Sequence, residues 1–395
     1  MSIKKTLKYI GLLLIAAVLV TIVSVLGYRY FERRAIAQSR AIHTADGVET
    51  LEEVSIGGIG QWIEIRGEST KNPVLLFIHG GPGSAFMPVA REFQRPWEKY
   101  FTVVQWDQRG AGKTYSSNSR DAVRPTMNIE RMHADTLEMA QYLRKRFAQD
   151  KIFVLGHSWG SILGLRLAHD HPELLHAYIG VGQAINSRDN ETVLYQETLA
   201  EAQKTQNQKA LKDLASIAPY PSPGVTFQQI RVVRQWSGEL IGPKGNDESW
   251  MSEKAIFLAP EYSLADDIGW FRGIFFSVDT LLPDLSKSDF ADLGYDYRGP
   301  IFFMEGKHDP YTPSSIAKDF LDKMNDPEKH FVWFENSGHF PFKEEAQKFT
   351  DTLVQQVLPL AHVANGESQV PHAGATAASV MKTPNRKTQK QTHGD

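Results

Sequence analysis

The chain has 395 residues, of which 42% are hydrophobic and 11% aromatic, and its formal net charge is -3. This composition is typical of a globular protein with a sizeable core, and the small net charge gives no reason to expect a nucleic-acid partner. Because the chain has no cysteine, a thiol nucleophile, a disulfide framework and a cysteine-ligated metal are excluded.

The N-terminal segment predicts a membrane anchor. No charged residue falls between Lys8 and Arg29, and residues 9–28 form an apolar stretch that, as a helix, is long enough to cross a bilayer. A cleaved signal sequence and a buried helix of a soluble protein are the alternatives. Basic residues lie on both sides of the stretch and leave its orientation open. We expect a single-pass membrane protein with its catalytic domain outside the cytoplasm, or a secreted protein if the segment is cleaved.

Short apolar runs predict strands buried on both faces of a sheet. These runs begin at Pro73, Phe101, Lys151, Ala177 and Pro300. Helical patterns lie between them, notably over residues 129–147 and 161–168. This alternation predicts a mostly parallel sheet flanked by helices, with ligands bound beyond the carboxyl ends of the strands.

The alternation stops over residues 186–293, where mixed helical stretches and aromatic clusters predict an inserted, mainly helical cap. Residues 47–185 and 294–360 then form the core, and residues 29–46 connect it to the anchor as a juxtamembrane linker. The last stretch, 361–395, has no aromatic residue and is rich in small and polar ones, so we expect a disordered tail.

The stretch "GHSWG" places one glycine two residues before Ser158 and another two residues after it. An apolar strand precedes this stretch, and a helical pattern follows it until Pro172. A strand, a sharp turn and a helix are the context that exposes a nucleophilic serine above a parallel sheet, and glycines leave room for so tight a turn. Ser158 is therefore the predicted nucleophile.

A serine hydroxyl needs a histidine as its base and a carboxylate to orient that histidine. Asp309 follows the strand "PIFFMEG", and His339 follows the strand "HFVWF". The order serine, aspartate, histidine along the chain is that of the α/β-hydrolases. We therefore expect Ser158, Asp309 and His339 to form a catalytic triad.

Acyl transfer also needs N–H donors for the oxygen that becomes negative. The backbone N–H of Trp159, directly after the nucleophile, is one candidate. The loop "HGGPG", which follows the strand "VLLFI", offers a second through Gly81. We expect these two groups to form the oxyanion hole.

The motifs "HGGPG", "DQRGAGKT", "GHSWG", "GKHD" and "SGHF" together resemble the proline iminopeptidase family of α/β-hydrolases. The resemblance implies a serine hydrolase without a metal or cofactor, with Ser158, Asp309 and His339 as its triad. Family peptidases hold the amino terminus of the substrate with cap glutamates. In the family, one of these glutamates ends a tryptophan-rich segment as Trp-Glu, and the nearest echo here is "RQWSGEL", in which Glu239 follows Trp236 by three residues. Glu239 is the candidate substrate-binding residue, and a solvated helix glutamate is the alternative.

The predicted function is a membrane-tethered serine hydrolase that acts through an acyl-enzyme and removes N-terminal proline or another small residue from short peptides. A carboxylesterase or amidase with the same machinery is the first alternative, because the cap alone distinguishes the two. A catalytically silent binding module is the second, although the chain lacks no member of the triad. The sequence leaves the oligomeric state open.

Overall fold

The computed structural model describes residues 3–244, 248–325 and 328–364. Its centre is an eight-stranded sheet with the order β1-β2-β4-β3-β5-β6-β7-β8. The strands are β1 (Val48–Ile56), β2 (Ile59–Gly67), β3 (Val74–Ile78), β4 (Thr102–Asp107), β5 (Ile152–His157), β6 (Leu175–Val181), β7 (Ile301–Gly306) and β8 (Lys329–Phe334). All neighbours from β4 to β8 are parallel, whereas β2 is antiparallel to both β1 and β4.

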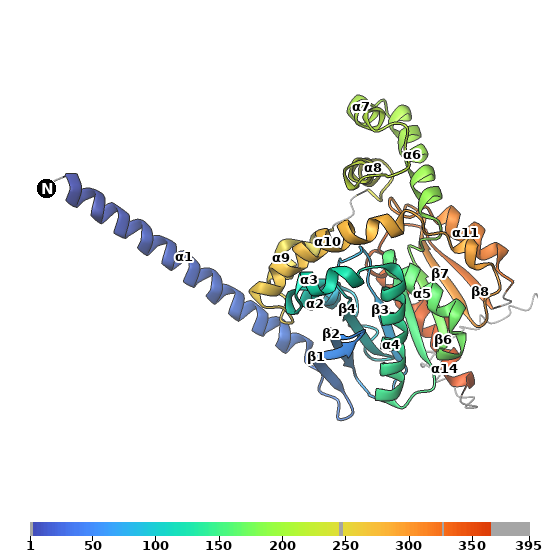
Figure 1. Ribbon diagram of the computed structural model, residues 1–395. Coiled ribbons are helices and arrows are strands. Elements are labelled where there is room, and N and C mark those ends of the chain that lie inside the picture. Colours follow the sequence, from blue (N-terminus) through green and yellow to red (C-terminus); the bar gives the residue numbers. More distant parts are fainter. Residues whose placement is uncertain (1–2, 245–247, 326–327, 365–395) are drawn as a thin grey trace, which may run out of the picture.

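The central strands are buried because helices cover both faces of the sheet. Every residue of β3, β4, β5 and β7 is buried, as their apolar sequences predict. Apolar side chains of α4 (Ile129–Phe147), α5 (Trp159–Asp170) and α11 (Ser314–Lys323) pack on one face. Those of α13 (Ala346–Thr352) and the 87–97 segment pack on the other. The predicted α/β-hydrolase fold, a mostly parallel sheet flanked by helices, is confirmed (Figure 1).

The shorter elements connect these layers. They are η1 (Met87–Glu92), α2 (Gly112–Ser117), α3 (Arg120–Val123), η2 (Arg124–Thr126), η3 (Pro172–Leu174), α12 (Pro341–Glu344), the π-helical turn Leu353–Val357 and α14 (Pro359–Ala364). The predicted tail over residues 361–395 lies outside the described residues, except for its first four, which belong to α14.

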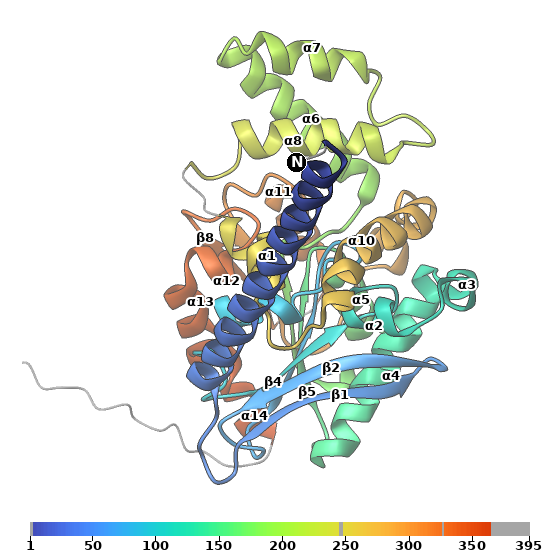
Figure 2. The same cartoon turned by 90° about the vertical axis from the view of Figure 1, so that its left-hand side faces the viewer.

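The insertion between β6 and β7 is helical and covers the carboxyl edge of the sheet (Figure 1). It contains α6 (Ser187–Lys204), α7 (Gln208–Ser216), α8 (Phe227–Leu240), η4 (Glu248–Met251), α9 (Glu253–Phe257), α10 (Leu264–Leu285) and η5 (Phe290–Leu293). Helices α6, α7 and α8, at the top of Figure 2, share a small apolar cluster of their own. Helix α10 instead lies directly on the core, where Gly269 and Gly273 allow close approach to α2 and the loop before it.

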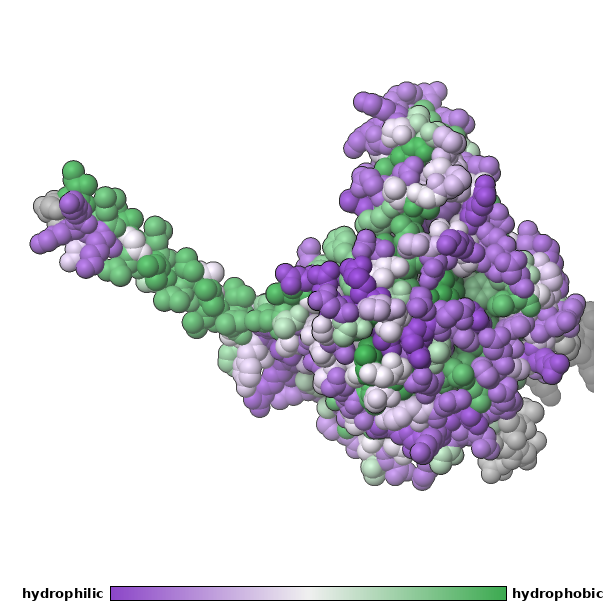
Figure 3. Space-filling view, in the orientation of Figure 1, coloured by the Kyte–Doolittle hydropathy of each residue, from purple (hydrophilic) through white to green (hydrophobic). Residues whose placement is uncertain are grey.

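The N-terminal helix α1 (Ile3–Arg40) is longer than the predicted anchor. Its most apolar 18-residue window is not buried at all, and by length and composition the helix can cross a membrane. In Figure 3 this part projects from a largely hydrophilic body. The segment expected as a linker over 29–46 is helical as far as Arg40.

The docked end of α1 is held by its arginines. Arg29 forms an ion pair of 2.9 Å with Asp267, and Arg33 donates to the Pro260 carbonyl at 2.7 Å. Arg40 is buried against Glu64 at 3.3 Å. Arginines of the segment expected as a linker therefore fasten helix α1 to the body. Sequence composition does not reveal these contacts.

Candidate active site

Ser158 lies at the turn between β5 and α5. Its backbone φ is +51°, in the left-handed region that residues other than glycine seldom adopt. The Ser158 N–H donates to the Val181 carbonyl at 2.9 Å, which fixes the turn above the sheet. This strained backbone presents the hydroxyl at the start of α5.

The two flanking glycines are required by their surroundings. A Cβ on Gly160 would lie 2.1 Å from the Ile78 carbonyl oxygen, and a Cβ on Gly156 would lie 2.6 Å from the Gly160 carbonyl oxygen. No real side chain tolerates such distances. The turn around Ser158 can form only because both positions lack a side chain.

Asp309 and His339 meet at the ends of β7 and β8. Nδ1 of His339 donates to Oδ2 of Asp309 at 2.7 Å, and both residues are buried. The other carboxylate oxygen accepts backbone N–H groups from Tyr311 and Thr312 at 2.8 and 2.9 Å. Burial alone raises the pKa of Asp309, but the His339 charge and these hydrogen bonds outweigh burial and hold the pKa below its usual value. The carboxylate is thus ionised and fixes the orientation of the imidazole.

The backbone of His339 is also held in place by the side chain of His157. Nε2 of His157 lies 2.9 Å from the His339 carbonyl oxygen, and burial lowers the pKa of His157 well below its usual value. His157 is therefore a neutral group under the histidine backbone. Ser158 and His339 line one cavity. Among the described residues, no hydrogen bond joins Ser158 Oγ to His339 Nε2.

The two candidate oxyanion donors flank Ser158. The loop after β3 approaches so closely that a Cβ on Gly80 would lie 3.1 Å from the Ser158 Cβ. Trp159 begins α5, where the first N–H groups of a helix have no partner within it. The described residues give no hydrogen bond from the N–H of Gly81 or of Trp159. Both groups therefore remain candidate donors for a substrate oxygen.

Gln108 ties these two donor segments together, a role that the sequence did not reveal. Its side-chain amide donates to the His79 carbonyl at 2.9 Å and accepts from the Trp159 indole at 3.0 Å. The "DQRG" motif is otherwise structural. Arg109 pairs with buried Asp135 at 2.7 Å, and burial raises the pKa of Asp107 to about 7.

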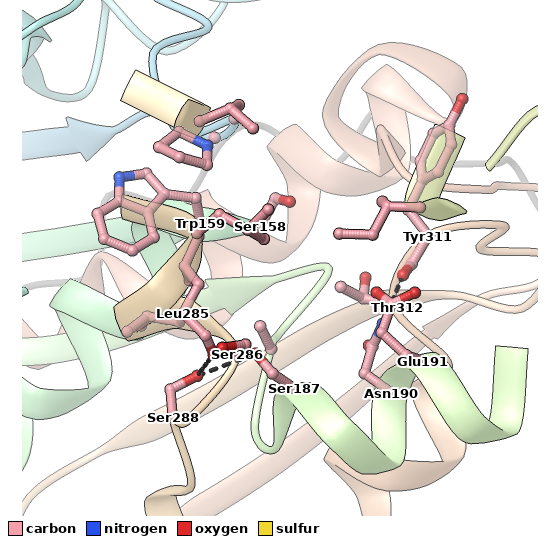
Figure 4. A pocket seen from close by; sticks show the side chains of 18 of the residues that line it. Ser158, Trp159, Ser187, Asn190, Glu191, Leu285, Ser286, Ser288, Tyr311 and Thr312 are labelled. Carbon is pink, nitrogen blue, oxygen red and sulfur yellow. Dashed lines mark hydrogen bonds between the residues drawn. The ribbon is translucent and has the colours of Figure 1, made fainter. Parts of the chain in front are cut away.

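A cavity of about 610 Å³ lies above Ser158, between the sheet edge and the cap. Figure 4 shows Ser158 and Trp159 on one side of it and Glu191 of α6 and Tyr311 on the other. Glu239 is exposed on α8 and does not line the cavity. The structure therefore does not bring the predicted substrate-binding glutamate to the site.

Glu191 is the one acidic side chain among the described residues that line this cavity. It already forms an ion pair with Arg234 and accepts a hydrogen bond from the Tyr220 hydroxyl. Two further basic side chains, those of Arg188 and Lys287, also line the cavity. Basic groups thus outnumber acidic ones around the candidate site.

No group of three or more histidine, aspartate or glutamate side chains is placed to hold a metal ion within the described ranges. The residues that gather around Ser158 are suited to nucleophilic and acid–base chemistry: a serine at a strained turn, a histidine oriented by an ionised carboxylate, and two backbone donors.

Comparison with known proteins agrees with this arrangement. Residues 73–346 match the family described as the alpha/beta hydrolase fold. A probable aminopeptidase of Bacillus subtilis, YbaC, is 32% identical over 78% of this chain and 95% of its own length. A proline iminopeptidase of Clostridioides difficile is 27% identical over 75% of this chain and 94% of its own length.

Among solved structures, the proline iminopeptidase of Mycobacterium smegmatis aligns with a TM-score of 0.55 and 17% identity, over 80% of this chain and all of that one. This likeness shows the shared fold. The sequence matches extend from the strand before the "HGGPG" loop past His339, and thus include every motif of the site. The chain belongs to the α/β-hydrolase family, and within that family to the proline iminopeptidase-like hydrolases.

Proposed function

We propose that the protein is a serine hydrolase that works through an acyl-enzyme on Ser158. The observation that carries this proposal is the buried His339–Asp309 pair beside a serine held at a strained turn. Ser158 Oγ attacks the substrate carbonyl carbon while His339 Nε2 takes the hydroxyl proton, and Asp309 stabilises the charged imidazole. His339 then returns the proton to the leaving group, and water releases the acyl group by the same steps.

The N–H groups of Gly81 and Trp159 receive the negative oxygen of each tetrahedral intermediate in this proposal. One such donor contributes about 2.7–4 kcal/mol to transition-state stabilisation in related sites. The close approach of the Gly80 backbone to Ser158 supports this role.

For the substrate, we propose an N-terminal residue, proline or another small one, at the end of a short peptide. The names of the two relatives and their near-complete coverage support this class. Glu191, rather than Glu239, is the cap carboxylate positioned to meet a substrate amino group, because it lines the cavity.

A second candidate is an esterase or amidase with no need for a free amino group. The observation that favours it is the pairing of Glu191 with Arg234 and Tyr220, which already occupies the carboxylate. A free ammonium group then gains little in the cavity.

The test is a substrate panel with the full chain in detergent: prolyl and alanyl arylamides, the same arylamides with blocked amino groups, and a short aryl ester. A peptidase prefers the free over the blocked arylamide by about tenfold or more, because a charge-assisted hydrogen bond contributes 1.5–3 kcal/mol. Equal turnover of both forms points to the esterase or amidase. The Ser158→Ala variant supplies the background rate.

We further propose that α1 tethers the enzyme to a membrane with the body outside the cytoplasm. Arg29, Arg33 and Arg40 are engaged by the body. On the other side of the stretch, Lys4, Lys5 and Lys8 are exposed and outnumber Arg34, the exposed arginine of α1 that bonds only within the helix, so the lysines favour the cytoplasmic side. If the N-terminus were cleaved, the protein would be secreted. Carbonate-washed membranes and protease access in sealed vesicles test the tether and its orientation.

A further inference from the structure

One face of α10 exposes an unusual number of large apolar side chains. Outside α1, the described residues include six large apolar side chains that are exposed, and four of them share this face. They are Leu264, Ile268, Phe271 and Phe275, with exposed fractions of 48%, 55%, 38% and 62%. Their spacing of four, three and four residues places them in one stripe along the helix. The opposite side of α10 faces the core, so this α10 stripe is available to a partner.

The stripe begins at the level where the apolar part of α1 ends. Arg29, the first charged residue after that part, pairs with Asp267 and donates to the Tyr262 carbonyl at 3.0 Å. Exposed Tyr30 and Phe31 lie beside it on α1. Aromatic side chains concentrate at membrane–water interfaces, so the start of α10 is fastened to the helix at interface height.

In Figure 1, helix α10 runs across the line of α1 instead of continuing it. With α1 crossing a bilayer, α10 therefore follows the bilayer surface. An amphipathic helix in this position buries its apolar face about 5–10 Å into the headgroup layer. The α10 stripe has the length and the side chains for such a contact.

The charges beside the α10 stripe also favour a lipid surface as its partner. Phe275 lines a groove that also contains Arg120, Arg124 and Arg272, all three exposed. Asp279, the one acidic side chain among the described residues of that groove, pairs with Arg124 at 3.3 Å, so Arg120 and Arg272 are the arginines left for a ligand. Guanidinium groups beside an apolar stripe match the phosphates of a lipid surface better than a neutral protein surface.

The groove also adjoins the catalytic cavity. Both are lined by Val225, Phe227, Val278 and Leu282. We propose that the α10 stripe rests in the headgroup layer of the membrane that holds α1, and that amphipathic substrates pass from this layer through the groove to Ser158. This inference rests on the proposed membrane tether and on the proposed hydrolase.

Because the natural chain has no cysteine, single-cysteine labelling tests the contact directly. Ile268→Cys and Phe271→Cys place a bimane label on the stripe, Val18→Cys places one in α1, and Trp333→Cys is the matched control. Trp333 is also an exposed large apolar residue but lies on β8, at the sheet edge far from α1 (Figure 1). Each full-length variant is reconstituted in phosphatidylcholine–phosphatidylglycerol vesicles with or without doxyl-labelled lipid.

Doxyl lipid is expected to quench the labels at 268 and 271 by about half, because they lie within the headgroup layer. The label at 18 should be quenched as well, and the label at 333 should be unchanged. Quenching at 18 without quenching at 268 and 271 overturns the inference but leaves the tether intact. No quenching at 18 overturns the tether itself. A disulfide between two Ile268→Cys chains would mean that a second copy covers the stripe, and this also overturns the inference.

The substrate route has its own test in the same vesicles. The double variant Leu264→Ser/Ile268→Ser changes only stripe residues that line neither cavity nor groove. Its rate should fall several-fold for an ester carried in the vesicle membrane and stay unchanged for a soluble short-chain ester. An equal change of both rates in a variant that a fluorophosphonate still labels at Ser158 contradicts the route. A wild-type chain that the fluorophosphonate does not label at Ser158 contradicts the proposed hydrolase.

Discussion

In the core, the backbone around Ser158 leaves no room for an added side-chain atom. In the cap above it, the groups that line the cavity are held by pairs of side chains. In the core, the Ile78 and Gly160 carbonyl oxygens would lie within 2.6 Å of any Cβ added at the two elbow glycines. In the cap, Glu191 is held by Arg234 and Tyr220, which belong to different segments of the insertion. Replacing one side chain of the cap therefore alters specificity, while adding one methyl group at the elbow disrupts the site itself.

The largest effect is expected from Gly160→Ala. The new Cβ would lie 2.1 Å from the Ile78 carbonyl oxygen, so the oxyanion loop and the elbow cannot both keep their places. We expect a loss of activity of at least about a hundredfold and destabilisation by several kcal/mol, as for other overpacked buried sites.

The matched control is Gly238→Ala in α8, where the nearest atom would be 3.8 Å away. Replacing this helical glycine should stabilise the protein by about 0.5–1 kcal/mol, with activity unchanged. Activity assays and melting curves compare the two variants. If Gly160→Ala behaves like its control, the steric account of the elbow is wrong.

The next effect is expected from Gln108→Leu, which removes the link between the His79 carbonyl and the Trp159 indole. Because Gln108 acts through the two donor segments, we expect kcat to fall by about ten- to a hundredfold, less than for a lost oxyanion donor. KM and the melting temperature should change little. Gln108→Glu keeps the acceptor for the Trp159 indole, so its kcat should lie between the kcat of wild type and that of Gln108→Leu. If Gln108→Leu changes KM alone, Gln108 has no positioning role.

In the cap, Arg234→Leu should change specificity and leave the chemistry intact. Removing the guanidinium leaves Glu191 without its cation, so the cavity gains a carboxylate able to receive a substrate ammonium group. The preference for free over blocked prolyl arylamide should rise by about tenfold. Glu239→Gln is the control and should leave the preference as it was, since Glu239 does not line the cavity. A parallel shift in both variants would refute the assignment of Glu191.

The smallest effect concerns pH. Burial raises the pKa of Asp107 to about 7, compared with about 3.9 in an unfolded chain. Between these two pKa values, the folded state holds a proton on Asp107 that the unfolded chain has lost. The stability that this proton provides is fully present below about pH 4 and is lost as the pH rises to 7. Asp107→Asn removes this titration.

The melting temperature of wild type should fall relative to that of Asp107→Asn as the pH rises from 5 to 8, and the difference between the two should change by about 2–4 °C. A difference between variant and wild type that stays constant over this range would show that the Asp107 carboxyl does not titrate there.

The features that the sequence predicted are those encoded over short distances. Apolar runs predicted the central strands. Ser158 and Asp309 each follow one of these runs and His339 follows the predicted strand "HFVWF", which was enough to expect all three at one edge of the sheet. The hairpin of β1 and β2 was not predicted, because β1 is only partly buried and its sequence is rich in glutamate. Its apolar signal is therefore weak.

The remaining features depend on contacts between distant segments. Nothing near Arg29 in the sequence indicates that it forms an ion pair with Asp267. The part of α1 that begins at Arg29 was therefore predicted to be a linker. Glu239 was chosen because it lies near a tryptophan, whereas the helix phase and the placement of the cap turn Glu191 into the cavity. The role of Gln108 could not be predicted because its partners lie in two other segments, the loop after β3 and the start of α5.

The most direct test of the central claim is to identify the residue modified by a fluorophosphonate. The full chain, incubated with the probe and digested, should carry a single adduct on Ser158, because this hydroxyl has a strained turn and an oriented histidine beside it. Labelling should be absent in Ser158→Ala and much slower in His339→Ala. An adduct on another residue, or undiminished labelling of Ser158→Ala, would contradict the assignment of Ser158 as the nucleophile.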